Sequence, residues 1–475
     1  MKLIVCSNSA PRWQNGVGLL PRSPGGLVPL LVTLLEEFGG DWICTAPAGA
    51  PDRDGEPVRL PGEVTLHQVR LPEPVLEQHY LTIGVRLMLW LFHYLLDTSR
   101  EPAFDSEFAR AWAGYEAVNR AYADRLAGVA ANSVDELILI NDYHLFLLPE
   151  LLSGPAERRG RLAFFHGLPW CEPDYYGILP AAIRDRILAS LLCCDVVGFH
   201  DSRWAAAFLS CCARFLPGCQ VSEREVAYQG HETRIAVAPF PLDIDALRRM
   251  DTEPSTDRWR ERMAVLGAGR RVVARADRLD LWKNQPRGFA AYRALLDREP
   301  DLSGQWWFCA VATPPSRSTE RSREHQRLCE AMVADINDRF ATPDRPAVSL
   351  VYPDAASSRN CVTAALSGAE VTLVNPTIDG MNLVAKEALF LAERAPLLLS
   401  VNAGAYEHLA GHVMPVQPYD VTATATALRE AMCGTGSAPR GFPGRHAELR
   451  HLLAGQGAAG WLAQLADSDP RESQR

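Results

Sequence analysis

The chain has 475 residues, which is enough for two domains of about 200 residues, each with its own hydrophobic core. Its hydrophobic and charged fractions, 47% and 22%, are those of an ordinary globular protein. The net charge of −9 argues against an extended basic surface for nucleic acid, so an anionic ligand would have to bind in a local basic site.

The N-terminal segment predicts a first β-strand and not a signal peptide, because the apolar run in residues 1–6 is short and lacks a small-residue cleavage pattern. The most hydrophobic segment, residues 81–96, is too short to span a bilayer and predicts a buried helix. The twelve cysteines form no ligand-spaced cluster, and the adjacent pairs at 193–194 and 211–212 lie in apolar helical segments. We therefore expect a reduced, cytoplasmic protein without a membrane partner.

Strand-like apolar runs alternate with helix-like segments in both halves of the chain. The runs are residues 3–6, 136–140 and 162–165 in the first half, and 272–274, 306–311, 348–351, 371–374 and 397–400 in the second. This alternation predicts an α/β protein with two doubly wound parallel sheets covered by helices on both faces. Ligands of such folds bind beyond the carboxyl ends of the strands, so polar residues that follow strands are candidate site residues.

A proline-rich step at residues 238–241, Ala-Pro-Phe-Pro, predicts the boundary between the domains because two prolines interrupt regular structure. We expect a first domain over residues 1–240 and a second over residues 241–445. Residues 446–466 predict C-terminal helices, and the polar tail 467–475 is expected to be disordered.

Two cations follow the first strand of the second domain. Arg278 and Lys283 lie in the loop after strand 271–275, where side chains of α/β folds bind diphosphates, Lys283 as a point charge and Arg278 as a fork. Without other evidence, two such cations are more often solvent-exposed charges of a loop than ligands of a phosphate. A glycine-led helix further along the chain makes diphosphate binding the favoured interpretation.

That helix begins within residues 379–387, Asp-Gly-Met-Asn-Leu-Val-Ala-Lys-Glu, directly after a buried strand. Near Gly380, free backbone amides and the positive end of the helix dipole can face an anion. The carboxylates of Asp379 and Glu387 can accept hydrogen bonds from sugar or ribose hydroxyls. An ordinary strand, turn and capped helix is the alternative.

These motifs resemble those of the trehalose-6-phosphate synthase family, which are retaining glycosyltransferases of the GT-B fold. In the second half the resemblance rests on Arg278-Leu279-Asp280 with Lys283, on residues 379–387, on Ala403-Gly404-Ala405 and on Pro418-Tyr419-Asp420. In the first half it rests on residues 5–8, 25–27, 142–145 and 165–169. The resemblance implies two Rossmann-like domains that face a central cleft, with the C-terminal helices packed back on the first domain.

The resemblance also implies residue roles. The implied catalytic residues are His166, Arg278, Lys283 and Asp379. The implied donor-binding residues are Gly26, Arg278, Lys283, Gly380, Met381, Asn382, Leu383 and Glu387. The two cations would contact the diphosphate, Glu387 the ribose, and Asp379 and His166 the transferred ring. Retention without a dedicated nucleophile suggests front-face attack, in which the departing phosphate oxygen takes the acceptor's proton, so we assign no general base.

Ordinary structural roles compete with several of these assignments. A lone histidine at a strand end, such as His166, is a structural residue about as often as a ligand. Asp142 and His144 could cap the helix that follows them. The Asp-x-Asp spacing of metal-dependent transferases occurs at residues 52–54 and 243–245, but both lie in turn-like segments where loop and cap roles are more common. We predict no metal and no cofactor apart from a UDP- or GDP-linked donor.

The acceptor side departs from the family. Ser7-Asn8-Ser9 stands where the family has Ser-Asn-Arg, whose arginine holds the acceptor's 6-phosphate. Arg317 corresponds to the other phosphate-binding arginine with a shifted spacing, and Arg12 could replace the lost one if its side chain points correctly. The implied acceptor-binding residues are Ser9, Trp42, Tyr80, Asp142, Tyr143 and Arg317. Glucose 6-phosphate is therefore a doubtful acceptor.

The middle of the chain resembles one branch, the validoxylamine 7'-phosphate synthase type of pseudoglycosyltransferase, which joins a nucleotide-activated cyclitol to an amine. This resemblance rests on residues 166–170, 174–180, 183–184, 230–234 and 283–284. Met381 and residues 384–386 instead resemble the sugar-using synthases.

We therefore expect a retaining glycosyltransferase or pseudoglycosyltransferase that moves a nucleotide-activated sugar or cyclitol to an amino-sugar or amino-pseudosugar acceptor in aminocyclitol natural-product biosynthesis. A trehalose-6-phosphate synthase that uses glucose 6-phosphate and a catalytically silent sugar-nucleotide-binding regulator are the alternatives. The expected partners are small molecules, and a homo-oligomer remains open.

Overall fold

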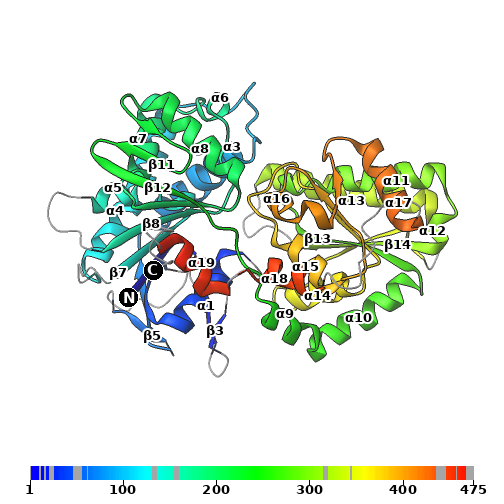
Figure 1. The fold of residues 1–475 in the computed structure, drawn as a ribbon. Helices are drawn as coiled ribbons and strands as arrows, with labels where there is room; N and C mark the ends of the chain where they lie inside the picture. Colours follow the sequence, from blue (N-terminus) through cyan, green and yellow to red (C-terminus); the bar gives the residue numbers. More distant parts are fainter. Residues whose placement is uncertain are drawn as a thin grey trace. The chain divides into compact units, whose positions relative to one another are not determined.

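The chain forms two compact units, each built on its own sheet of mainly or wholly parallel strands (Figure 1). The computed structural model describes residues 2–9, 12–14, 18–20, 26–46, 56–60, 62–130, 136–153, 160–313, 319–342, 345–434, 446–455 and 457–466. The first unit comprises Met1–Phe240 together with Ala458–Arg475, and the second comprises Pro241–Gly457. The predicted tail 467–475 and the Asp-x-Asp at 52–54 lie outside the described residues.

The first unit is built on a ten-stranded sheet in the order β10-β11-β12-β9-β8-β7-β1-β4-β6-β5. Its parallel strands are β1 (Lys2–Ser7), β4 (Gly40–Thr45), β6 (Val64–Val69), β7 (Glu136–Asn141), β8 (Arg161–His166), β9 (Val196–Phe199) and β12 (His231–Val237). The antiparallel strands are the edge strands β5 (Val58–Leu60) and β10 (Gln220–Val221) and, next to β10, β11 (Glu225–Tyr228). Strands β2 (Arg12–Gln14) and β3 (Gly18–Leu20) pair separately.

Helices cover both faces of this sheet (Figure 1). They are α1 (Leu27–Phe38), α2 (Glu73–Glu77), the π-helix η1 (Gln78–Leu89), α3 (Trp90–Phe92), α4 (Ser106–Ala127), η2 (Tyr143–Leu145), α5 (Leu148–Leu152), α6 (Pro173–Tyr176), α7 (Ala181–Leu191), α8 (Ser202–Phe215) and α19 (Gly457–Ala466). Adjacent residues of β9 show the two faces. The Phe199 ring lies 5.4 Å from Phe208 of α8, whereas a Cβ at Gly198 would meet Leu465 of α19 at 2.5 Å. Glycine at 198 thus allows α19 to pack closely on the sheet.

The second unit contains a six-stranded, fully parallel sheet in the order β15-β14-β13-β16-β17-β18. Its strands are β13 (Arg271–Arg278), β14 (Trp306–Thr313), β15 (Val348–Val351), β16 (Val371–Val374), β17 (Leu397–Ser400) and β18 (Met414–Val416). Its helices are α9 (Ile244–Asp251), α10 (Pro254–Gly267), η3 (Leu281–Lys283), α11 (Gln285–Arg298), α12 (Leu302–Gln305), α13 (Glu320–Phe340), α14 (Ser358–Ser367), α15 (Leu383–Leu391), α16 (Ala405–Leu409), η4 (Ala410–His412), α17 (Val421–Cys433) and α18 (His446–Ala454).

Two apolar layers enclose this second sheet. One joins the strands to buried residues of α11, α13 and α17, among them Phe289, Ile336 and Leu428. The other joins them to α10, α14 and α15, among them Trp259 and Leu389. Because both faces are covered, the strands are continuous apolar runs, as expected for a parallel sheet.

All eight apolar runs expected to be strands lie in strands of the structure, so the prediction of two parallel α/β sheets is confirmed. The apolar segment expected to be a buried helix is the π-helix η1 followed by α3. We expected both C-terminal helices on the first domain, but only α19 belongs to the first unit; α18 belongs to the second, where Leu453 is buried in the apolar core. No helix within the described ranges is long and apolar enough to cross a membrane.

Candidate functional site

The turn that carries Lys283 is fixed by the neighbouring strands of the second unit. It follows β13 as the short helix η3, and Asn284, with a φ of 62°, starts the step into α11. The Asn284 side chain donates hydrogen bonds to the main-chain oxygens of Asn375, at 2.9 Å, and Pro418, at 2.8 Å. These two residues follow β16 and β18, so the loop is tied to the carboxyl edge of the sheet.

The second element of the site is the junction between β16 and α15. The Asp379 main chain exchanges hydrogen bonds with the segment after β17, since its N–H donates to Asn402 at 3.2 Å and its carbonyl accepts from Gly404 at 3.0 Å. Asn382 has a φ of 75° and caps α15 by accepting from Ala385 N at 3.3 Å. Asparagine tolerates this left-handed conformation better than most residues. The junction therefore presents the N-terminal end of α15 at the same edge as Lys283.

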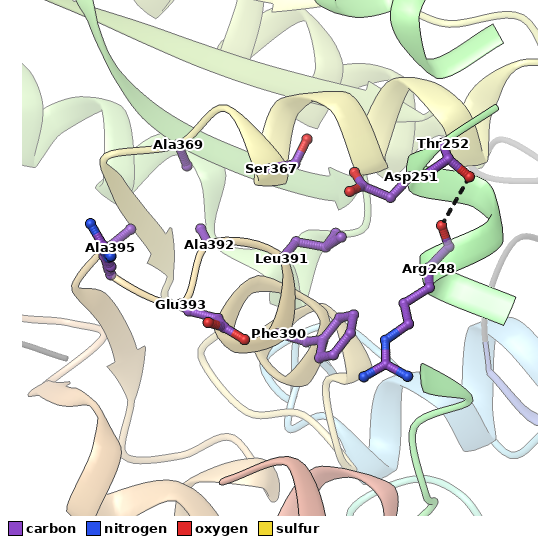
Figure 2. A pocket seen from close by; sticks show the side chains of 11 residues that line it. Arg248, Asp251, Thr252, Ser367, Ala369, Phe390, Leu391, Ala392, Glu393 and Ala395 are labelled. Atoms are coloured by element: carbon purple, nitrogen blue, oxygen red, sulfur yellow. Dashed lines mark hydrogen bonds between the residues drawn. The ribbon is translucent and has the colours of Figure 1, made fainter. Parts of the chain in front are cut away.

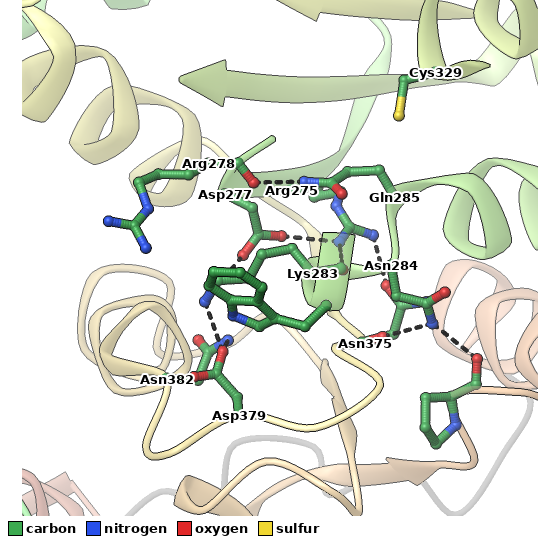
Figure 3. A network of polar contacts seen from close by, with 12 residues as sticks. Arg275, Asp277, Arg278, Lys283, Asn284, Gln285, Cys329, Asn375, Asp379 and Asn382 are labelled. Atoms are coloured by element: carbon green, nitrogen blue, oxygen red, sulfur yellow. Dashed lines mark hydrogen bonds and ion pairs between the residues drawn. The ribbon is translucent and has the colours of Figure 1, made fainter. Parts of the chain in front are cut away.

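Lys283 and the β16–α15 junction meet in an ion pair (Figure 3). The Nζ atom of Lys283 lies 2.6 Å from Oδ2 of Asp379 and 3.9 Å from Oδ1 of Asp277. Burial opposes the charged form of Lys283, but the two carboxylates outweigh it and raise its pKa. For Asp277 the effect of burial is the opposite, because burial disfavours the charged carboxylate and raises its pKa. The amino group is thus held in its charged form at the carboxyl edge of the sheet.

A buried arginine supports the Lys283 turn from within the sheet. Arg275 is 1% exposed, and its guanidinium bonds to Asp277 at 2.9 Å, to Asn375 Oδ1 at 2.5 Å and to the main-chain oxygen of Lys283. A Cβ at Gly288 would lie 2.6 Å from this guanidinium, so glycine leaves the space it needs. The main chain at Lys283 is therefore held while its amino group remains on a flexible stem.

The other predicted donor residues of the second unit lie near the same edge, and Arg278 and Glu387 form ion pairs separate from that of Lys283. Arg278 is half exposed and contacts Asp280 at 2.7 Å. Glu387 is buried and accepts from Arg359 at 2.9 Å. Met381 is also buried, whereas Leu383 is half-buried. Sequence reasoning missed Arg359, because no local spacing connects it with a carboxylate on another helix.

In the first unit, Asp142 follows β7 with a φ of 72° and a ψ of 170°, a region that residues other than glycine rarely adopt. Its carboxylate accepts from the N–H of Tyr143 at 3.1 Å and of Gly167 at 3.4 Å. Burial raises the pKa of Asp142 to about 7. The capping role named as an alternative is present, and the strained backbone is of the kind found at functional sites.

His166 lies at the end of β8, with Nδ1 3.6 Å from Asp142 Oδ1. Its ring has no exposed surface and is surrounded by Phe92, Phe146 and Trp170, with centroids 4.7–5.6 Å away. Burial lowers the pKa of His166 to about 3, so the ring is neutral. Among the described residues Nδ1 has no hydrogen-bond partner. The packing favours a structural role, and contact with a transferred ring stays a prediction.

The side chain of Trp42 is completely buried and donates its indole N–H to Ser7 Oγ at 2.9 Å, and its contact with an acceptor stays a prediction. It lies inside β4, where residues 41–44 are buried on both faces of the sheet. Ser9 is half-buried near the end of β1, and its carbonyl accepts from Ser7 Oγ at 2.9 Å. Arg317 and the side chain of Arg12 lie outside the described residues.

Tyr80, on the π-helix η1, stacks on His144 with a centroid distance of 5.6 Å. Tyr143 is mostly buried and packs on the same His144 ring at 4.0 Å. Tyr80 and Tyr143 therefore pack on the ring of His144, whereas the Asp142 carboxylate lies beside His166.

Gly26, a predicted donor-binding residue, precedes α1 with a φ of 89°, a conformation for which glycine is suited.

A pocket of about 660 Å³ lies elsewhere in the second unit (Figure 2). Its lining includes the ends of α9, α14 and α15, with Ala369 just before β16 and Ala395 just before β17. It therefore lies at the amino ends of these strands, opposite the edge where α/β folds bind ligands. The Asp-x-Asp at residues 243–245 lies at the start of α9. Asp243 caps this helix, and Asp245 pairs with Arg248.

The geometry described above, cations and carboxylates at the carboxyl edge of a parallel sheet, suits a phosphorylated sugar ligand. The sequence matches the model of Glycosyltransferase family 20 over residues 6–467. The chain belongs to glycosyltransferase family 20. It is 30% identical over 447 residues to the UDP-forming alpha,alpha-trehalose-phosphate synthase of Botryotinia fuckeliana, covering 91% of this chain and 82% of that protein. The corresponding protein of Schizosaccharomyces pombe is also 30% identical, with coverages of 91% and 83%.

Solved structures of this family have the same fold. An E. coli protein bound with UDP-2-fluoro glucose is 26% identical with a TM-score of 0.83, covering 99% of this chain and 100% of that one. An alpha,alpha-trehalose-phosphate synthase from Burkholderia vietnamiensis is 27% identical with a TM-score of 0.85, covering 98% of each chain. The family 20 chain is therefore a retaining glycosyltransferase of the GT-B fold, as the sequence motifs predicted.

Proposed function

We propose that this family 20 enzyme transfers glucose from UDP-glucose, with retention of the anomeric configuration, to glucose 6-phosphate. The observation that carries the donor half is Lys283, a charged amino group held at the carboxyl edge of the sheet beside Asp379 and the start of α15. The relatives named UDP-forming trehalose-phosphate synthases support both donor and acceptor. This was the alternative in the sequence analysis, and the comparisons support it better than an amino-sugar acceptor.

The proposed chemistry is stabilisation of a departing diphosphate. As the bond between the anomeric carbon and the phosphate oxygen breaks, negative charge develops on the diphosphate, and Lys283 and Arg278 offset it. The dipole of α15 acts in the same direction. Asp379 accepts hydrogen bonds from ring hydroxyls and Glu387 from the ribose. The leaving phosphate oxygen takes the proton of the acceptor hydroxyl on the same face, so a separate general base is not required.

A second candidate is transfer to an acceptor that carries no phosphate, such as an amino sugar or an aminocyclitol. The observation that favours it is Ser9, a short neutral side chain near the end of β1 where the family motif has a phosphate-binding arginine. A dianionic phosphate bound without that guanidinium loses a charge-assisted contact, which is typically worth about 1.5–3 kcal/mol.

An acceptor competition assay distinguishes these candidates. The enzyme is incubated with UDP-glucose and GDP-glucose in turn, together with glucose 6-phosphate, glucose and glucosamine, and products are identified by mass spectrometry. We expect a disaccharide phosphate from UDP-glucose and glucose 6-phosphate as the main product. Preferred formation of a phosphate-free amino disaccharide would replace the first candidate with the second.

Substitution of Ser9 by arginine tests the same point on the protein. If the side chain at position 9 faces the acceptor phosphate, Ser9→Arg lowers the KM for glucose 6-phosphate by about tenfold or more, as a charge-assisted contact predicts. The KM for UDP-glucose serves as the internal control and is expected to stay unchanged. An unchanged KM for glucose 6-phosphate would show that another group binds the phosphate.

A further inference from the structure

Lys283 is already paired with a carboxylate in the structure. Oδ2 of Asp379 contacts its amino group at 2.6 Å and also accepts from Asn382 Nδ2 at 3.0 Å, so the carboxylate is held beside the cation (Figure 3). With the Arg275–Asp277 pair, the cluster contains two cations and two carboxylates, and its formal charge is zero. A neutral cluster attracts a diphosphate less strongly than an unpaired lysine would.

Under the proposed function both members of this pair have a different partner. Lys283 is to contact the diphosphate, and Asp379 is to receive hydroxyls of the sugar. While Lys283 keeps its 2.6 Å contact with Asp379, at least one of its three N–H donors is directed at that carboxylate and not at the diphosphate. Loosening of the pair lets the ammonium direct more of its donors to the diphosphate oxygens.

The surroundings allow the amino group to move while the turn stays in place. The main-chain oxygen of Lys283 is held by the buried guanidinium of Arg275. The lysine side chain, in contrast, is a flexible four-carbon stem that ends in an ammonium group with three N–H donors. Asp277 Oδ1 lies 3.9 Å from Nζ and has no hydrogen-bond partner among the described residues. It provides a second, weaker contact for the ammonium when Asp379 is engaged elsewhere.

We propose that Lys283 exchanges partners during turnover. Donor binding transfers its amino group from Asp379 to the diphosphate and frees the Asp379 carboxylate for the hydroxyls of the transferred sugar. After transfer the sugar has left Asp379, which recaptures Lys283 and weakens the hold on the nucleoside diphosphate product. This exchange rests on the proposed function, since it takes the diphosphate as the ligand of Lys283.

The exchange predicts effects of opposite sign for two ligands. Asp379 competes with UDP for Lys283, so Asp379→Asn tightens binding of UDP, which has no sugar to interact with residue 379. The same substitution removes a strong acceptor for sugar hydroxyls. The affinity for UDP-glucose should therefore rise less than the affinity for UDP, or fall. The ratio of the two affinities is therefore a specific signature of the exchange.

Calorimetric titration of the full-length protein with UDP, and separately with UDP-glucose, measures this signature. We expect Asp379→Asn to bind UDP on the order of fivefold more tightly than the wild type, the effect of about 1 kcal/mol of removed competition. We also expect the ratio of UDP-glucose affinity to UDP affinity to fall at least as much. Asp251→Asn is the matched control, because Asp251 pairs with Arg260 in the same unit and lies at the pocket on the opposite edge.

A double substitution separates competition for Lys283 from simple repulsion between Asp379 and the diphosphate. If Asp379 acts through Lys283, Asp379→Asn no longer tightens UDP binding in a Lys283→Met background. Tightening of equal size in both backgrounds would mean repulsion and would overturn the exchange. Unchanged or weaker UDP binding by Asp379→Asn alone would also overturn it.

The same titrations keep the exchange distinct from the proposed function. The proposed function requires that the wild type binds UDP and that Lys283→Met weakens this binding. If both hold and Asp379→Asn does not tighten UDP binding, the exchange is wrong and the function stands. If the wild type does not bind UDP, the proposed function fails at the donor.

Discussion

Asp142 combines a strained backbone with a buried carboxyl group. Its φ and ψ of 72° and 170° lie where glycine is normally required, and burial raises its pKa to about 7. Both features lower the stability of the folded protein at neutral pH, and neither is needed merely to cap a three-residue helix such as η2. Costs of this kind are retained where a side chain has a function, which supports Asp142 as an acceptor-binding residue.

The raised pKa gives a pH-dependent prediction for Asp142→Asn. In the folded protein the carboxyl group keeps its proton up to about pH 7, whereas in the unfolded chain it loses it near pH 4, so this group lowers stability as pH rises from about 4 to 7. The neutral amide removes that penalty. We expect Asp142→Asn to have a higher Tm than the wild type at pH 8, by roughly 2–4 °C for each kcal/mol of penalty removed.

Differential scanning calorimetry at several pH values checks this prediction. The advantage of Asp142→Asn should shrink as pH falls toward 4, where the wild-type carboxyl is neutral in both states. Asp335→Asn, at an exposed ion pair with Arg293, is the control and should show no such trend. A Tm difference that does not change with pH would contradict a raised pKa for Asp142.

At the scale of elements, the junction of β16 and α15 is where local sequence is most informative. Asn382 caps α15 in a left-handed conformation and also donates to Asp379. We expect Asn382→Ala to destabilise the second unit by about 1–2 kcal/mol, because alanine loses the cap and is strained at positive φ. Asn382→Gly keeps the backbone conformation and should cost only a few tenths of a kcal/mol.

Urea unfolding of both variants measures these free energies, and UDP-glucose affinity gives a second readout. Both substitutions remove the bond to Asp379, so both should weaken sugar-nucleotide binding even though only alanine is strained. Equal destabilisation by glycine and alanine would mean that the backbone conformation of residue 382 contributes little.

The sequence predicted this junction because an apolar run, a glycine and a helical pattern follow one another without a gap. The sequence singled out Gly380 as the residue between strand and helix, but the residue with a positive φ at this junction is Asn382. It could not reveal the ion pairs of Lys283 with Asp379 or of Glu387 with Arg359, since these form only when different strands and helices come together. The motif resemblance that named Trp42 also gave no sign that its side chain is completely buried. The π-helical form of η1 has no signal in the apolar pattern.

At the scale of the whole molecule, the chain returns to the first unit after completing the second. Trp461 of α19 is 2% exposed, packs on Phe165 and Phe240 with centroids 5.0 and 5.3 Å away, and donates its indole N–H to Ala238 O at 2.9 Å. The last helix therefore completes the core of the unit that the chain began with.

Trp461→Ala is expected to destabilise the first unit selectively. Loss of a buried tryptophan typically costs about 3–5 kcal/mol, and here a buried carbonyl also loses its donor. Calorimetry should show a lower transition temperature for the unfolding of the first unit, with the transition of the second unit unchanged. Trp259→Ala, in the core of the second unit, is the matched control and should shift the other transition. If Trp461→Ala lowered only the transition that Trp259→Ala lowers, the assignment of α19 would be contradicted.

The proposed reaction of this family 20 chain is transfer of glucose from UDP-glucose to glucose 6-phosphate with retention. The most direct measurement is proton NMR of the reaction of these two substrates, with UDP release followed in the same sample. We expect stoichiometric release of UDP and a disaccharide phosphate in which the transferred glucose gives an α-anomeric signal. Release of UDP without a disaccharide phosphate, or a β-anomeric signal from the transferred glucose, would contradict the proposed reaction.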